Sequence, residues 1–170
     1  ELRRVLPLRI RVGEFALSKS QRRNLRKNLD MEVQIGGVEL SPDIHELFHR
    51  HKTRFKSDVP NSISEFLGRD GELPTDARCL SVRQNDALIA ASFFDIGRET
   101  ISSIYGIFDP QLAHRGLGIF TLLMEIEFAR EKGKSFFYHG YAYEGESFYD
   151  YKKRFSPLEI FDWNGSWSAP

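Results

Sequence analysis

The chain has 170 residues, of which 41% are hydrophobic and 28% charged, a balance typical of a folded domain rather than a disordered segment. This length suits one domain with its own core, and no apolar run approaches the roughly 18 residues of a membrane-spanning helix. The single cysteine, Cys79, excludes an internal disulfide and a metal site built from several cysteines, so we expect a reducing, cytoplasmic setting.

The formal net charge of zero conceals a basic N-terminal segment. Only two acids, Glu1 and Glu14, occur in residues 1–27. The bases in the same stretch are Arg3, Arg4, Arg9, Arg11, Lys19, Arg22, Arg23, Arg26 and Lys27. Such a segment either binds phosphate groups or forms a solvated surface, and the run of bases between Lys19 and Lys27, uninterrupted by acids, is suggestive of RNA binding.

The first half of the chain predicts two strands and several helices. Alternating apolar residues predict strands over 6–15 and 31–35, the second ended by Gly36-Gly37. Ser18 is a good N-cap for a basic helix to about residue 28, and Ser41-Pro42-Asp43 starts a helix to about residue 54. A short helix over 61–67 and a loop over 68–76 complete this half.

The second half predicts three antiparallel strands over 77–83, 87–96 and 101–108. A long helix over 116–131, a short buried strand over 136–138, a helix-like segment over 147–154 and a last strand over 158–161 follow. This order resembles the GNAT acyltransferase fold, an α/β fold with a mostly antiparallel mixed sheet flanked by helices.

The turn into the long helix reads Arg115-Gly116-Leu117-Gly118-Ile119-Phe120. It resembles the GNAT turn whose backbone N–H groups, together with the helix dipole, bind the pyrophosphate of acetyl-CoA. Phe120 stands where that turn normally has a small residue. Acetyl-CoA binding and a purely geometric role for the glycines therefore both stay open.

The last third carries the most specific pattern. His139-Gly140-Tyr141 follows an aromatic run, and Tyr151-Lys152-Lys153-Arg154-Phe155-Ser156-Pro157-Leu158-Glu159 follows it. This order resembles the closing signature of the aminoacyl-tRNA–protein transferases, the arginyl- and leucyltransferases that add an amino acid to protein N-termini. Segments 7–23, 102–110 and 117–130 resemble the same family in the same order, and that family also has a bulky residue at the glycine turn.

The resemblance implies a single GNAT-like aminoacyltransferase domain over residues 1–170, with residues 1–30 as its basic segment. Its catalytic residues would be Tyr141, Tyr151 and Tyr105, which can donate to an oxyanion or relay a proton. Substrate would be bound by Lys152, Arg154, Asp109, His139 and Glu159. The tRNA would be bound by Lys19, Arg22, Arg23, Arg26, Lys27 and Arg115. Buried tyrosines and solvated bases are the alternative readings.

Two departures from the family pattern limit these implications. The family has a cysteine-containing N-terminal region that is absent from these 170 residues. Glu144 and Glu146 lie within the signature, close to where the family has basic residues, so the acceptor is left open.

A competing motif is His45-Glu46-Leu47-Phe48-His49, which on a helix would place two imidazoles on one face for zinc. His51 points away from that face, so a third ligand would have to come from His114, His139 or a distant carboxylate. The same residues also fit an amphipathic helix with apolar positions in the core, and we expect no metal.

The sequence therefore predicts an aminoacyl-tRNA-dependent transferase of the arginine or leucine class, acting on a protein or peptide N-terminus. Charged tRNA would be the co-substrate, no further cofactor is expected, and no membrane partner is expected. Two alternatives stay open. One is an acetyl-CoA-dependent N-acetyltransferase, and the other is a catalytically silent RNA-binding domain.

Overall fold

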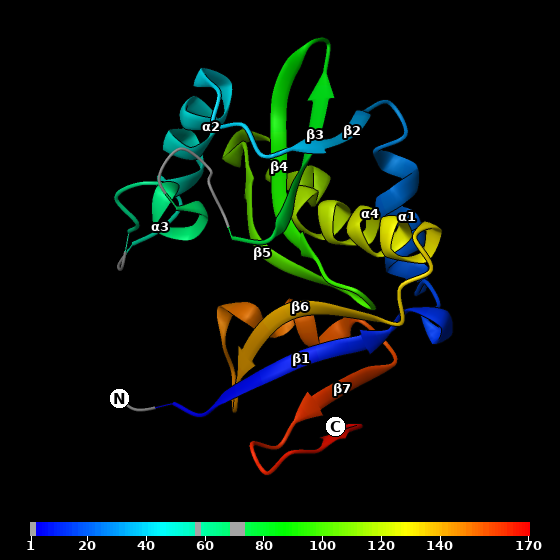
Figure 1. Ribbon diagram of the computed structural model, residues 1–170. Coiled ribbons are helices and arrows are strands. Elements are labelled where there is room, and N and C mark those ends of the chain that lie inside the picture. The colour runs from blue at the N-terminus through cyan, green and yellow to red at the C-terminus, as the bar shows by residue number, and fades with distance from the viewer. Residues whose placement is uncertain (1–2, 57–58, 69–73) are drawn as a thin grey trace.

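A computed structural model describes residues 3–56, 59–68 and 74–170, and this part of the chain folds around an eight-stranded sheet. In spatial order its strands are β2 (Glu32–Gly37), β3 (Asp76–Gln84), β4 (Ala87–Ile96), β5 (Thr100–Phe108), β6 (Phe136–Tyr143), β1 (Val5–Arg11), β7 (Leu158–Phe161) and β8 (Trp167–Ser168). The β5–β6 pair is parallel and the other neighbours for which a register is defined are antiparallel. The first strand thus lies between two strands from the end of the chain (Figure 1).

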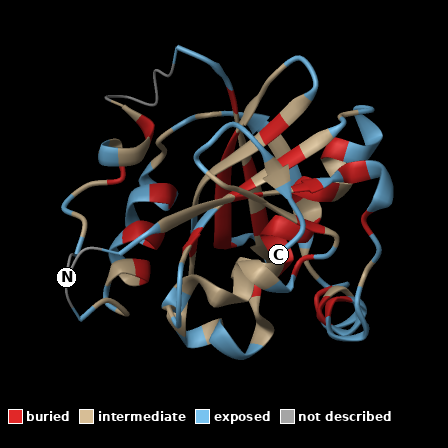
Figure 2. Ribbon diagram, turned by 90° about the horizontal axis from the view of Figure 1, so that it is seen from below, coloured by how far each residue is buried: buried red, intermediate tan, exposed pale blue. Residues whose placement is uncertain are grey.

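Helices cover both faces of this sheet. They are α1 (Lys19–Lys27), α2 (Pro42–Lys52), α3 (Ser64–Leu67) and α4 (Leu117–Glu131), with 3-10 turns η1 (Val12–Glu14), η3 (Pro110–Arg115) and η4 (Phe148–Arg154). The α4 helix packs on one face of β3, β4 and β5, and α2 packs on the other face of β4 and β5. Because both faces are covered, β4 is buried continuously from Leu88 to Phe94, and buried residues line the inner sides of the helices (Figure 2).

The expected mixed sheet flanked by helices is confirmed, and several element boundaries shift. The first strand ends at Arg11 because the chain turns into η1 instead of continuing to residue 15. The β2 strand includes Gly36 and Gly37, since both pair with β3. The strand expected over 136–138 continues to Tyr143 because β1 pairs with it along its length. Part of the loop expected over 68–76, residues 69–73, lies outside the described residues.

The Ser18 cap predicted for α1 is confirmed as a capping box. The Ser18 hydroxyl accepts a hydrogen bond from the Gln21 backbone N–H (3.2 Å), and the Gln21 side chain accepts one from the Ser18 N–H (2.8 Å). These reciprocal bonds fix the start of the basic helix.

The β5 and β6 strands pair only at their beginnings, where residues 100–102 lie opposite residues 136–138. Beyond this point they diverge. Register shifts leave an extra residue near the divergence in each strand, Ile104 against β4 and His139 against β1. Bulges of this kind bend a strand and redirect its side chains. The divergence opens the space in which the candidate site lies.

Candidate active site

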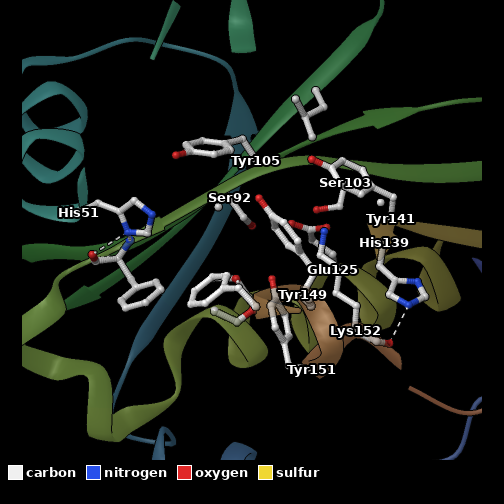
Figure 3. Close-up of a pocket in the computed structure, with 18 of the residues that line it drawn as sticks. His51, Ser92, Ser103, Tyr105, Glu125, His139, Tyr141, Tyr149, Tyr151 and Lys152 are labelled. Atoms are coloured by element: carbon white, nitrogen blue, oxygen red, sulfur yellow. Dashed lines mark hydrogen bonds between the residues drawn. The ribbon is translucent and has the colours of Figure 1, made fainter. Parts of the chain in front are cut away.

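A cavity of about 270 Å³ lies where β5 and β6 diverge. It is lined by residues from the end of α2, from β4, β5 and β6, from the first half of α4 and from η4. Figure 3 shows these side chains converging from elements that are far apart in sequence. Polar groups gathered in a concave site are typical of ligand-binding and catalytic pockets.

Glu125 is a charged residue on the buried face of α4. It is fully buried, and neither carboxylate oxygen has a hydrogen-bond partner. Burial raises the pKa of Glu125 to about 7, an effect opposed by the hydroxyls of Ser92 and Ser103 and by the charge of Lys152. The serine hydroxyls are thus close enough to influence the carboxylate, although neither reaches it in good hydrogen-bonding geometry.

Lys152 extends from η4 into the cavity toward Glu125 (Figure 3). Burial lowers the pKa of Lys152 to about 8, and the charge of Glu125 opposes that shift. The lysine crosses Gly140, where an added Cβ would lie 2.7 Å from Nζ and displace the ammonium, and the φ of +93° favours glycine at this position. No direct ion pair joins Lys152 to Glu125 among the described residues.

His139, the bulged residue of β6, holds the backbone at Lys152. Its Nε2 lies 3.0 Å from the Lys152 carbonyl oxygen, which can only accept, so Nε2 carries the hydrogen. Burial lowers the pKa of His139 to about 4, which keeps the ring neutral. His139 therefore positions Lys152.

Four tyrosines form an aromatic wall of the cavity. Tyr141 and Tyr149 have ring centroids 5.3 Å apart, and the Lys152 ammonium lies 5.6 Å from the first and 5.3 Å from the second. Tyr105 stacks on Phe66, and its buried hydroxyl has no partner. Burial raises the pKa of Tyr105 and of Tyr151 to about 12, so both remain hydrogen-bond donors at neutral pH.

His51, in the last turn of α2, and Arg54, just after the helix, line the cavity. The backbone N–H of Phe108 donates to His51 Nδ1 (3.0 Å), and burial lowers the pKa of His51 to about 4. The Arg54 guanidinium lies 4.6 Å from the Phe108 ring centroid and 4.9 Å from that of Phe148. Within the described ranges, Arg54 has no carboxylate partner.

Five of the predicted site residues therefore meet in this cavity: Tyr105, Tyr141, Tyr151, Lys152 and His139. Three others lie elsewhere. Arg154 is exposed and does not line the cavity, and Asp109 caps η3 and faces Arg50 at 3.5 Å. Glu159 lies in β7 and binds Arg9 at 2.6 Å and Arg11 at 3.0 Å, which joins β7 to β1.

The predicted tRNA-binding residues lie on or beside α1. Lys19, Arg22, Arg23, Arg26 and Lys27 are exposed on α1. The opposite face of this helix packs on the glycine turn, where Asn24 Nδ2 donates to the Gly116 carbonyl (3.0 Å) and Asn28 Nδ2 to the Arg115 carbonyl (3.1 Å). Arg115 itself is held by Asp30 at 2.8 Å.

The residues of the competing zinc motif do not converge. His45 and His49 are exposed on α2, and Glu46 forms an ion pair with Arg50 at 3.0 Å. The described residues contain no group of three or more His, Cys, Asp or Glu that could hold a metal ion. No helix among them is long and apolar enough to cross a membrane.

Several cavity residues are not among the predicted site residues, and one of them carries a signal in the sequence. Glu125 occupies the same helix face as Leu122, Ile126 and Ala129, so it is an acid at core spacing. His51, Arg54 and Tyr149 gave no such signal, because the chain must fold before they approach β5 and η4.

The sheet and its flanking helices have the GNAT-like fold. A solved structure of a GCN5-related glucosamine N-acetyltransferase region, from a fungal multi-domain β-N-acetylglucosaminidase, aligns with 93% of this chain and 20% of that chain. The TM-score is 0.57 at 12% sequence identity, so this likeness concerns the fold alone.

The sequence identifies the family within that fold. A family model described as "Arginine-tRNA-protein transferase, C terminus" matches residues 43–162, and the chain belongs to this family. An aspartate/glutamate leucyltransferase of Stenotrophomonas maltophilia is 34% identical over 167 residues, which are 91% of this chain and 65% of the relative. One from Marinobacter nauticus is 32% identical over 165 residues, 95% of this chain and 69% of the relative. The chain thus spans about two thirds of these relatives.

Proposed function

We propose that this chain transfers an amino acid from charged tRNA to the N-terminal amine of a protein or peptide. The observation that carries the proposal is the convergence of Tyr141, Tyr151 and Lys152, from the closing signature, with Tyr105 of β5 on one cavity. Attack of an amine on an aminoacyl ester needs an aligned amine, a proton acceptor and donors for the oxyanion. The tyrosine hydroxyls are suited to the last task.

The proposed amino acid is leucine and the proposed acceptor begins with Asp or Glu. The named activity of the relatives supports both choices. Arg54 supports the second, because its guanidinium lies among aromatic rings with no carboxylate partner in the described part of the chain. A planar guanidinium in such a position is suited to bind a carboxylate side chain. Arginine as the transferred residue is the alternative within the same family.

The tRNA would lie along α1. This helix exposes its basic side chains on one side and packs on Gly116 with the other. Gly118, two residues after Gly116, lines the cavity, so α1 lies close to the candidate site. The bases would bind the phosphate backbone while the aminoacylated end enters between β5 and β6. A reaction that consumes charged tRNA would take place in the cytoplasm and mark acceptor proteins at their N-termini, as in an N-degron pathway.

Acetyl-CoA is the less favoured donor. The α1 helix covers the turn that would hold its pyrophosphate, with Asn24 Nδ2 only 2.7 Å from a Cβ built at Gly116. A Cβ built at Gly118 would touch the Phe108 ring at 3.5 Å, and Phe120 is buried in the core. Because this packing fills the glycine turn, it supports a donor other than acetyl-CoA, one that does not place a pyrophosphate there.

The test is a transfer assay with labelled donors. The chain is incubated with leucyl-tRNA, arginyl-tRNA or acetyl-CoA and with peptides that begin with Asp, Glu, Asn, Gln or Ala. We expect leucine to be transferred to the Asp and Glu peptides, and Arg54→Gln to remove the preference over Asn and Gln. Acetyl transfer without aminoacyl transfer would overturn the proposal, and tight tRNA binding without any transfer would favour the RNA-binding alternative.

A further inference from the structure

We infer that Glu125 and Lys152 are the catalytic proton acceptor and proton donor of the transfer, with Glu125 accepting the proton of the attacking amine and Lys152 protonating the departing ribose oxygen. This inference rests on the proposed function. Neither residue's role follows from the family match or from the names of the relatives.

The case for Glu125 begins with its unsatisfied oxygens. Both are buried without a hydrogen-bond partner, and Glu125 lines the cavity. A carboxylate without partners in such a position is costly, and this cost is offset when a ligand supplies N–H donors. In the proposed reaction the acceptor amine supplies them.

The case for Lys152 rests on how firmly the lysine is aimed. His139 holds its carbonyl at 3.0 Å, and Gly140 leaves the space through which its side chain passes. The rings of Tyr141 and Tyr149 flank the ammonium at 5.6 and 5.3 Å. Because no direct ion pair joins Lys152 to Glu125 in the described structure, each group is available to a substrate atom.

The proton balance is complete without any further reactant. The neutral amine attacks the ester carbon, a C–N bond forms, and the carbonyl electron pair moves to oxygen, where tyrosine hydroxyls can donate to it. Glu125 takes a proton from the attacking nitrogen. When the oxyanion collapses, the bond from carbon to the ribose oxygen breaks, and that oxygen takes a proton from Lys152. Transfer of one proton from Glu125 to Lys152 restores the starting state.

The charged and titratable groups around this pair leave a clear pH window. The charge of Glu125 acts on Tyr151 and on Cys79. Burial raises the pKa of each of these two groups to about 12. His139 and His51 are neutral, because burial lowers the pKa of each to about 4. Arg54 retains its charge. Among these groups, therefore, Glu125 and Lys152 are the two that change charge between about pH 5.5 and 9.

The experiment is a single-turnover pH profile of leucine transfer with saturating tRNA, comparing the wild-type chain with Glu125→Gln. General acid–base catalysis contributes roughly 100-fold or more, so we expect the ratio of wild-type to variant rates to reach about 100 at pH 8. Below pH 7 this ratio should fall about tenfold for each pH unit, because the wild-type carboxylate becomes protonated. The acceptor amine titrates in both proteins and cancels from the ratio.

Matched variants complete the test. Glu127→Gln changes a half-exposed acid of the same helix, which pairs with Arg130 outside the cavity, and should leave the rate unchanged. Lys152→Met should lower the rate about 100-fold, and Lys153→Met should not. If the wild-type chain transfers leucine and Glu125→Gln folds, a pH-independent ratio would overturn the inference and leave the proposed function standing. A higher KM for tRNA with an unchanged rate would instead assign Glu125 to binding the donor's amino group. Absence of transfer by the wild-type chain would contradict the proposed function itself.

Discussion

At the scale of single residues, the buried carboxylate of Glu125 makes stability depend on pH in a predictable direction. Burial raises its pKa from 4.5 to about 7, so its favourable protonated state is fully present below pH 4.5 and is lost as the pH rises through 7. Glu125→Gln removes this loss. The free energy of unfolding of the variant, relative to wild type, should therefore increase by about 3 kcal/mol between pH 4 and pH 8.

Urea denaturation at half-unit pH steps measures this difference. His51 and His139 have lowered pKa values, so their contribution runs in the opposite direction and is lost as the pH falls below 6.5. Both histidines are present in the two proteins and cancel. If the difference in the free energy of unfolding between the two proteins stays constant across the pH range, the pKa of Glu125 is not raised in the folded state, which contradicts this prediction.

Gly140 provides a second prediction. Its φ of +93° strains any other residue, and an added Cβ would displace the Lys152 ammonium. Gly140→Ala should therefore lower both stability, by about 1–2 kcal/mol, and transfer. Gly145→Ala is the matched control, because its φ is +88° but nothing lies within 4 Å of its Cβ position.

The control variant should lose a similar amount of stability and retain transfer. Thermal melts and single-turnover rates of the two variants give the comparison. Equal transfer rates for both would contradict the placement of Lys152 over Gly140.

At this scale the sequence predicted some of the residues that line the candidate site. The family resemblance implies functional roles for five residues that converge on one cavity, namely Tyr105, Tyr141, Tyr151, Lys152 and His139. Glu125 is not among the predicted site residues, because the pattern of the helix over 116–131 indicates its apolar core positions and not the cavity that one of its acids enters. Glu159, a predicted substrate-binding residue, forms ion pairs with Arg9 and Arg11, and this pairing requires β1 to lie beside β7.

At the scale of elements, the docking of α1 on the glycine turn depends on a few polar contacts. Asn24 is buried and donates to the carbonyls of Arg115 (3.3 Å) and Gly116 (3.0 Å). Asn24→Ala should therefore reduce the free energy of unfolding by about 1–2 kcal/mol. Arg26→Gln, an exposed change on the same helix, should stay within about 0.5 kcal/mol. Equilibrium urea unfolding distinguishes the two, and equal values would contradict the docking of α1.

The sequence predicts an element boundary where a local signal sets it. It does not predict a boundary that depends on strand pairing with a distant part of the chain. Ser18 caps α1, and Pro42 in the first turn marks the start of α2, although the Ser41 side chain makes no capping hydrogen bond; signals of this kind act locally. By contrast, β6 continues through Gly140 because β1, from the other end of the chain, pairs along it. No local pattern indicates that partner. The bulge at His139, which helps to shape the cavity, depends on the same pairing.

At the scale of the whole molecule, the basic face of α1 should make tRNA binding depend on salt. Arg26→Gln should weaken tRNA binding and lower the slope of log K against log salt concentration by roughly 1, because about one phosphate contact is lost. Arg98→Gln carries the same charge change at the exposed turn between β4 and β5 and should leave the slope unchanged. Filter binding across a range of salt concentrations tests this, and equal slopes for both variants would indicate that tRNA does not follow α1.

The central claim is that the cavity between β5 and β6 catalyses aminoacyl transfer from tRNA. The most direct measurement is the appearance of labelled leucine on a peptide that begins with Glu, using leucyl-tRNA as the only donor. We predict transfer by the wild-type chain and by Glu127→Gln, and about 100-fold slower transfer by Lys152→Met. No labelled peptide from leucyl- or arginyl-tRNA, together with acetylation of the same peptide from acetyl-CoA, would contradict the claim.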